Sequence, residues 1–197
     1  MEAERALRAV GVKHFHFLCE SDPIVDQELY LQLDRAFTDL RETLDAEMPD
    51  AILTLAYEGG HPDHDCCSFM ATLAAREFGL PAWEMPLYHR QGETFRPQQF
   101  LHGQEGMELD VLREEMALKL RMWREYESQA GVMREFVCGR ERFRPLHDYD
   151  YWRPPHPGVL NYEAWQWPMT GNDLCRAFSA LALSISNRKN ERGTAAW

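Results

Sequence analysis

The sequence contains no run of apolar residues long enough to cross a membrane. Of its 197 residues 45% are hydrophobic, but no stretch approaches the roughly 18 consecutive apolar residues of a membrane span. The N-terminal stretch MEAERALRAVGVKH is charged and lacks the apolar centre of a secretory signal. We therefore expect a single cytoplasmic domain over residues 1–197, with a less regular part over residues 145–197.

Cysteine pairs and excess positive charge are also lacking. The five cysteines form no CxxC pair, and their odd number does not describe a disulfide framework. The sequence contains 21 Lys and Arg residues and 32 Asp and Glu residues, which gives a net charge of −11. Because nucleic-acid binding depends on cations that neutralise phosphates, we expect no nucleic-acid partner. Small neutral or cationic ligands fit this charge better, and the oligomeric state stays open.

Hydrophobic periodicity predicts alternating helices and strands. Apolar residues at helical spacing indicate helices, and short apolar or alternating runs between turn signals indicate strands. Helices are predicted over residues 2–10, 27–47, 65–78, 109–125 and 172–185, and strands over residues 12–18, 51–56 and 83–88. This order favours an α/β fold, with a Rossmann-like, doubly wound and mostly parallel sheet flanked by helices.

The segment with the clearest chemistry is Gly59-Gly60-His61-Pro62-Asp63-His64, directly after the predicted strand 51–56. Two glycines permit a tight turn, and Pro62 disfavours helical angles at His61 while suiting the first turn of a helix. Ligands of open α/β sheets bind at this end of the strands. Two imidazoles and one carboxylate there can share the tasks of metal-assisted hydrolysis. Taken alone, the spacing leaves a metal site and an ordinary surface turn about equally open.

Other side chains have a weaker claim to the site. His14 and His16 are more readily explained as exposed residues at the edge of a strand than as metal ligands. Aromatic side chains of the C-terminal part could stack on sugar rings, although core packing is their commoner use. Further candidates for lining the crevice are Asp22, residues 88–90, Trp152, Trp165 and Trp167.

The run AYEGGHPDHDCCSFMATLA resembles the second signature of the PIG-L/LmbE family of zinc-dependent N-deacetylases of N-acetylglucosaminyl conjugates. The resemblance continues upstream through residues 4–12, Phe17-Leu18 and Asp22. Downstream it includes residues 126–129, with the sequence YESQ, and residues 141–143, with the sequence ERF. It covers residues 2 to 144, and the His-Pro-Asp-His loop is its most specific part.

The resemblance implies a role for each residue of the loop. His64 corresponds to a Zn²⁺ ligand, His61 to the histidine that stabilises the tetrahedral oxyanion, and Asp63 to the carboxylate that tunes that histidine. The implied activity is zinc-dependent removal of an acetyl group, or cleavage of a related amide, from an N-acetylated amino-sugar conjugate. That conjugate is the expected small-molecule partner.

The family's first signature, Ala-His-Pro-Asp-Asp-Glu, does not occur in this sequence. The resemblance assigns two zinc ligands and the general base to that signature, and places it at the end of the first strand. We therefore expect an N-terminally truncated domain that lacks one strand-helix-strand unit and that is inactive by itself. The alternative is a catalytically incomplete, non-enzymatic relative that binds sugars or metals.

Overall fold

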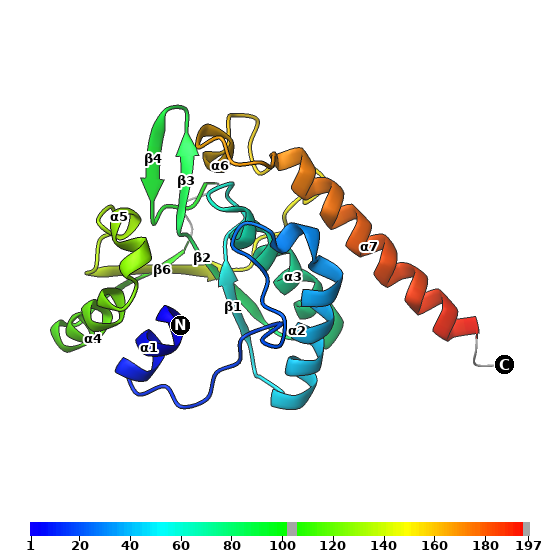
Figure 1. Cartoon of the computed structure of the whole chain (residues 1–197), viewed down its shortest axis with the longest axis horizontal. Coiled ribbons are helices and arrows are strands. Elements are labelled where there is room, and N and C mark those ends of the chain that lie inside the picture. The colour runs from blue at the N-terminus through cyan, green and yellow to red at the C-terminus, as the bar shows by residue number, and fades with distance from the viewer. Residues whose placement is uncertain (102–105, 195–197) are drawn as a thin grey trace.

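The computed structural model describes residues 1–101 and 106–194, with side chains up to residue 188. A four-stranded mixed sheet crosses the molecule (Figure 1), and a separate two-stranded hairpin stands beside its end. The sheet has the order β1 (Ile52–Leu55), β2 (Ala82–Met85), β6 (Arg140–Pro145) and β5 (Met107–Asp110). β1 and β2 are parallel, whereas the pairs β2–β6 and β6–β5 are antiparallel. The hairpin consists of β3 (Tyr88–Gln91) and β4 (Thr94–Pro97).

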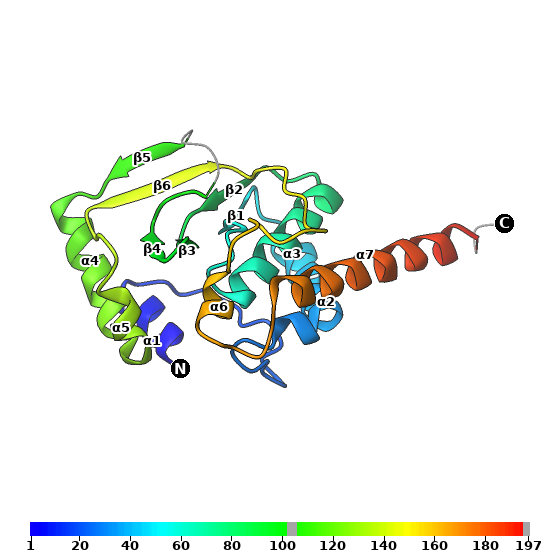
Figure 2. The same cartoon turned by 90° about the horizontal axis from the view of Figure 1, so that it is seen from above.

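The helices form two groups (Figures 1 and 2). α3 packs against β1, and α2 and α7 pack against α3 and against each other, while α1 lies beside α4 and α5 at the other end of the sheet. The first group comprises η1 (Leu29–Leu31), α2 (Leu33–Glu47), α3 (Pro62–Phe78) and α7 (Gly171–Thr194). The second group comprises α1 (Glu2–Ala9), α4 (Arg113–Arg124), η2 (Glu127–Gln129) and α5 (Ala130–Met133). The short α6 (Asn161–Ala164) lies apart from this group, near the start of α7.

The main core lies where α3 and α7 meet the end of β1. Phe178 of α7 stacks on Phe69 of α3 with a ring-centroid distance of 4.5 Å. Tyr57, which follows β1, and Tyr151 of the C-terminal part complete this aromatic cluster at centroid distances of 6.1 and 5.9 Å from Phe178. All four side chains are buried. The predominantly irregular segment between β6 and α7 therefore closes the core through its tyrosines.

The α/β class is confirmed, but the predicted mostly parallel sheet is not. Within the described residues the sheet contains one parallel and two antiparallel pairs. The predicted strand 12–18 is wrong: this segment is irregular, and its side chains are mainly exposed. The alternation of exposed and half-buried side chains is present, since Phe15 and Phe17 are half-buried and contact each other. A strand, however, also needs a neighbouring strand that pairs with its backbone hydrogen-bonding groups.

Several predicted boundaries also move. The predicted strand 83–88 stops at Met85, since Pro86 has no N–H for the ladder, and the chain resumes as β3 at Tyr88. The predicted helix 27–47 begins only at Leu33, after the short turn η1. None of the helices in the described chain is long and apolar enough to span a bilayer.

Candidate functional site

The loop between β1 and α3 presents both histidines at the head of a helix. His61 is the N-cap of α3: its backbone is extended, and its Nδ1 accepts a hydrogen bond of 3.2 Å from the Asp63 N–H. Pro62 occupies the first helical turn, where a missing N–H costs nothing. Since Nδ1 is an acceptor, the neutral His61 ring carries its proton on Nε2. This ring can therefore donate a hydrogen bond from Nε2.

Gly60 permits a very close approach between this loop and β3. A Cβ built at Gly60 would lie 1.9 Å from the Tyr88 carbonyl oxygen, closer than any real contact. The obstructing atom belongs to the backbone, so it cannot move away by a change of rotamer. Glycine is thus required here for packing, and the loop and β3 hold one another in place.

We predict that Gly60→Ala lowers the free energy of unfolding by about 3 kcal/mol, because the added methyl overpacks a junction of two backbones. Gly131→Ala is the matched control, since its Cβ would meet nothing within 4 Å. Denaturant unfolding of both variants measures the difference. Equal stability of the two variants would contradict the close approach at Gly60.

Two histidines and two carboxylates meet above this loop. The rings of His61 and His64 have centroids 4.7 Å apart, and Asp26 Oδ1 lies 3.5 Å from His61 Nε2. The carboxylate of Asp63 accepts the backbone N–H groups of Gln27 and Leu29, at 2.9 and 3.2 Å. Asp63 therefore anchors the segment that carries Asp26, and Asp26 is the carboxylate nearest to Nε2 of His61.

Burial dominates the pKa values of these groups. It lowers the pKa of His64 to about 3, with a further contribution from the neighbouring His61, so that the His64 ring is neutral at pH 7. Burial also lowers the pKa of His61, against the opposing effect of Asp63 and Asp26. The pKa of Asp63 is raised by burial, although the N–H groups of Gln27 and Leu29 and the charge of His61 oppose this. Neutral imidazole is the form that binds metals.

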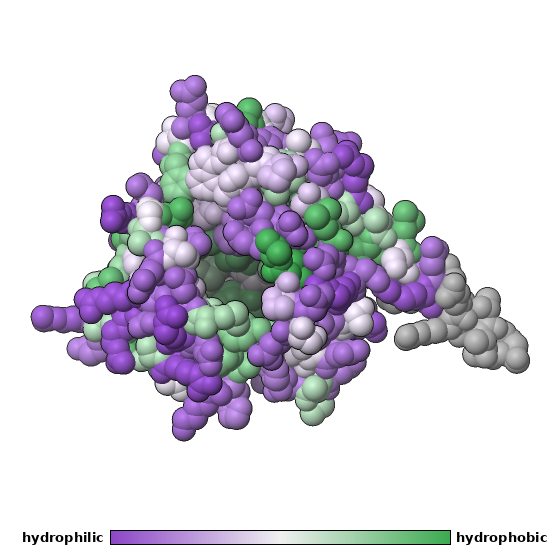
Figure 3. Space-filling model, in the orientation of Figure 1, coloured by the Kyte–Doolittle hydropathy of each residue, from purple (hydrophilic) through white to green (hydrophobic). Residues whose placement is uncertain are grey.

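A cavity of about 360 Å³ opens beside these groups. Asp26, His61, Asp63 and His64 line one end, and side chains from the end of β2 and from α4 and α5 line the other. The face drawn in Figure 3 is hollowed between the two groups of helices, and hydrophobic residues lie in the hollow. The volume falls within the range of small-molecule sites.

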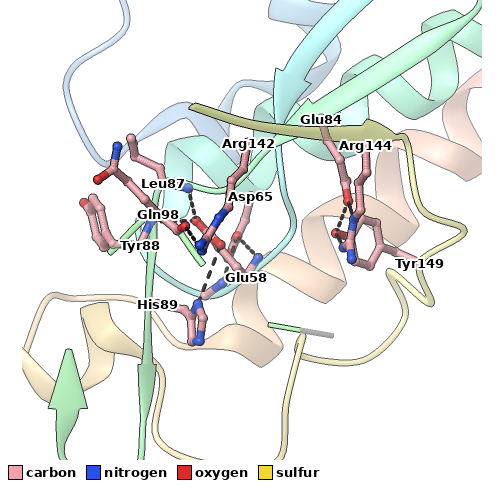
Figure 4. Close-up of polar contacts among 11 residues, drawn as sticks. Glu58, Asp65, Glu84, Leu87, Tyr88, His89, Gln98, Arg142, Arg144 and Tyr149 are labelled. Carbon is pink, nitrogen blue, oxygen red and sulfur yellow. Dashed lines mark hydrogen bonds and ion pairs between the residues drawn. The ribbon is translucent and has the colours of Figure 1, made fainter. Parts of the chain in front are cut away.

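A buried polar network supports the loop from below (Figure 4). Glu58 Oε1 accepts the backbone N–H groups of Leu87 and Tyr88, each at 2.7 Å, and thereby joins the segments that follow β1 and β2. Asp65 Oδ1 accepts the N–H groups of Glu58 and Gly59 at 3.2 and 3.1 Å. Burial raises the pKa of both carboxyl groups, that of Asp65 to about 8. Asp65 thus fixes the backbone that precedes His61.

The structure brings only some of the weaker sequence candidates to this site. Tyr88 lines the cavity, and Trp167 contacts His61 with a centroid distance of 5.0 Å. His89 is buried, with Nδ1 3.7 Å from Glu58 Oε2, and so belongs to the supporting network. Asp22 pairs with Arg35, and His16 pairs with Glu47. Neither of these pairs includes a residue that lines the cavity.

Sequence reasoning missed Asp26 and the supporting carboxyls Glu58 and Asp65. Asp26 lies in an irregular segment, and no local pattern marks it as a neighbour of a residue 35 positions later in the chain. Glu58 and Asp65 flank the His-Pro-Asp-His loop. Their charged side chains beside the end of an apolar strand were the signal in the sequence that could have identified them.

Comparison with known families supports the resemblance. The family model of the PIG-L proteins, described as GlcNAc-PI de-N-acetylase, matches residues 1–75. Residues 1–75 are of the PIG-L type. This PIG-L segment contains His61, Asp63 and His64 as well as Asp26, whereas α4 and α5 lie outside it. The family match therefore covers the end of the cavity that His61 and His64 line, and not its other end.

Solved structures of deacetylases are similar to this chain. A deacetylase triple mutant of the teicoplanin biosynthetic pathway is 18% identical with a TM-score of 0.51, over 75% of this chain and 70% of that chain. A deacetylase–teicoplanin complex is 16% identical with a TM-score of 0.46, over 75% and 73% of the two chains. At such identities the first of these structures shows a shared fold. Comparison with curated protein sequences gave no match.

Proposed function

We propose that this chain forms part of the active site of a zinc-dependent N-deacetylase that acts on an N-acetylated amino-sugar conjugate. The observation that carries the proposal is the meeting of His61, His64 and Asp26 at the head of α3, within the PIG-L segment and at one end of a cavity. We also propose a cytoplasmic location, where thiols stay reduced. In the structure the five cysteines are free thiols.

The donor groups of the site fit a zinc ion in their chemistry. Imidazole nitrogen and carboxylate oxygen are ordinary zinc ligands, and His64 is neutral at pH 7. Candidate donor atoms of Asp26, His61 and Asp63 also lie within 4.8 Å of one another. We assign zinc to His64, because His61 and Asp63 already have the capping and anchoring contacts described above. Zinc would supply polarisation of the amide carbonyl.

His61 and its carboxylate neighbours would serve the transition state. Its Nε2–H can donate to the oxygen of a tetrahedral intermediate, and Asp26 at 3.5 Å stabilises the protonated ring. Asp63 adds negative charge nearby and holds Asp26 through the Gln27 and Leu29 amides. Trp167 beside His61, and its neighbour Trp165, would form a face for the sugar ring.

The test separates zinc binding from proton transfer. Zinc titration followed by NMR of the histidine rings should shift the His64 signals, with weak affinity because one good ligand is fewer than catalytic sites use. His64→Ala should abolish the shift, and the matched variant Asp26→Asn should retain it. Any amine release from N-acetylglucosamine conjugates should require zinc and fall about 10²–10³-fold in His61→Ala, with zinc binding unchanged.

Two results would contradict this assignment. Zinc binding that survives His64→Ala and is lost in Asp26→Asn would place the metal on the cluster of Asp26, His61 and Asp63. Tight zinc binding together with no effect of His61→Ala on any amine release would favour the non-enzymatic, metal-binding alternative.

A further inference from the structure

The end of the cavity away from the histidines is mainly apolar. Met85 at the end of β2, Trp123 of α4, Val132 and Met133 of α5, and Phe136 line it. All five are partly exposed. A chain of rings connects this apolar end with the end at the histidines, since Tyr88 lies 5.7 Å from His64 and 6.2 Å from Phe136 between ring centroids. An acetyl group would leave most of these side chains without a partner.

Three of the polar side chains at this end, Gln98, Lys119 and Glu141, are engaged with protein groups. Gln98 uses both ends of its amide on the Val137 backbone, at 2.7 and 3.1 Å. Lys119 forms an ion pair with Glu141 and lies over the Trp123 ring. A sugar hydroxyl placed here would lose its water and compete with these existing contacts. An alkyl chain needs no hydrogen-bond partner, and its burial is favourable.

The position of the tryptophans indicates which part of a substrate enters the cavity. Trp167 contacts His61 but does not line the cavity. In the proposed function the sugar ring stacks on Trp165 and Trp167, and the amide carbonyl faces His61. The group on the other side of the carbonyl is the acyl chain, and it points toward α5.

We propose that the apolar end of this cavity binds the alkyl part of an N-acyl group longer than acetyl, so that fatty N-acyl amino sugars are substrates in addition to N-acetylated ones. This inference rests on the proposed function for the orientation of the amide. The recognition itself depends on the side chains of α4 and α5, which lie outside the PIG-L segment.

The experiment measures binding without added metal, by calorimetry, of glucosamines with an N-acetyl, N-butanoyl or N-hexanoyl group. Affinity should rise about fourfold for each buried methylene, which corresponds to about 0.8 kcal/mol. The hexyl glycoside of N-acetylglucosamine tests the other end of the ligand and should bind within about twofold of N-acetylglucosamine. Affinity independent of acyl length would overturn the inference, and so would a larger gain from the hexyl glycoside.

Substitution of a cavity residue provides the second arm. Met133→Gln, which keeps the length of the side chain but adds an amide, should weaken N-hexanoyl binding about tenfold and leave N-acetyl binding within twofold. Met107→Gln on β5, outside the cavity and 49% exposed, is the matched control. Thermal unfolding verifies that both variants fold. If Met133→Gln does not fold, Val132→Thr replaces it in the same binding test. Equal effects of Met133→Gln on all ligands would contradict an alkyl site.

The two proposals fail in different ways. Loss of the predicted His64 zinc shift would overturn the assigned metal chemistry but would leave the dependence on acyl length intact. Absence of that dependence, together with zinc binding at His64, would retain a deacetylase and remove only the fatty acyl group.

Discussion

Replacement of Arg144 by methionine is expected to lower the free energy of unfolding by about 3–5 kcal/mol. Arg144 on β6 donates from Nε to Glu84 Oε1 on β2 at 2.5 Å, and both side chains are buried. Tyr149 joins them, with its hydroxyl 2.8 Å from the same carboxylate oxygen and 3.0 Å from Arg144 Nη2 (Figure 4). Without the guanidinium, Glu84 is left as a buried charge that lacks its cation.

A double-mutant cycle with Glu84→Met distinguishes this cause from lost packing. The double variant Glu84→Met/Arg144→Met should recover much of the stability, because apolar pairs of similar volume often replace buried ion pairs without loss. The control is the exposed pair of Arg76 and Asp148, where Arg76→Met should change stability by less than about 1 kcal/mol. A cost for Arg144→Met no greater than that of Arg76→Met would show that the buried pair does not join β2 and β6 energetically.

Phe178→Ala is expected to destabilise the protein by about 3–5 kcal/mol, the usual cost of truncating a buried aromatic side chain. The Phe178 ring is completely buried and packs against Phe69, Tyr57 and Tyr151. Its removal leaves a cavity where α7, α3 and the end of β1 meet. Because Tyr57 directly precedes Glu58, we also expect the loop of His61 to lose order.

Leu183→Ala provides the comparison on the same helix. Leu183 is 65% exposed, so that its truncation should alter the free energy of unfolding by less than about 0.5 kcal/mol. Chemical denaturation of both variants measures the stability, and amide exchange of residues 59–61 reports the order of the loop. If Phe178→Ala were no more costly than Leu183→Ala, α7 would not be part of the central core.

Prediction from the sequence succeeded where the information is local. The helical spacing of apolar residues identified α1, α3, α4 and α7, and the short apolar run identified β1. It failed at residues 12–18, because alternation of side chains describes one face of a strand and says nothing of a neighbouring strand. It also missed the antiparallel β5 and β6, whose charged side chains do not give an apolar pattern.

The sequence by itself determined the loop that carries His61, Asp63 and His64. Glycine, proline and the N-capping histidine act within a few residues of one another, so His61, Asp63 and His64 had to lie together at the start of a helix. The partners of this loop were decided only by the tertiary structure. Asp26 beside His61, Glu58 beneath the loop, the Glu84–Arg144 pair and the apolar end of the cavity join segments far apart in the chain. Such contacts depend on how strands and helices pack, and no local pattern of residues encodes that packing.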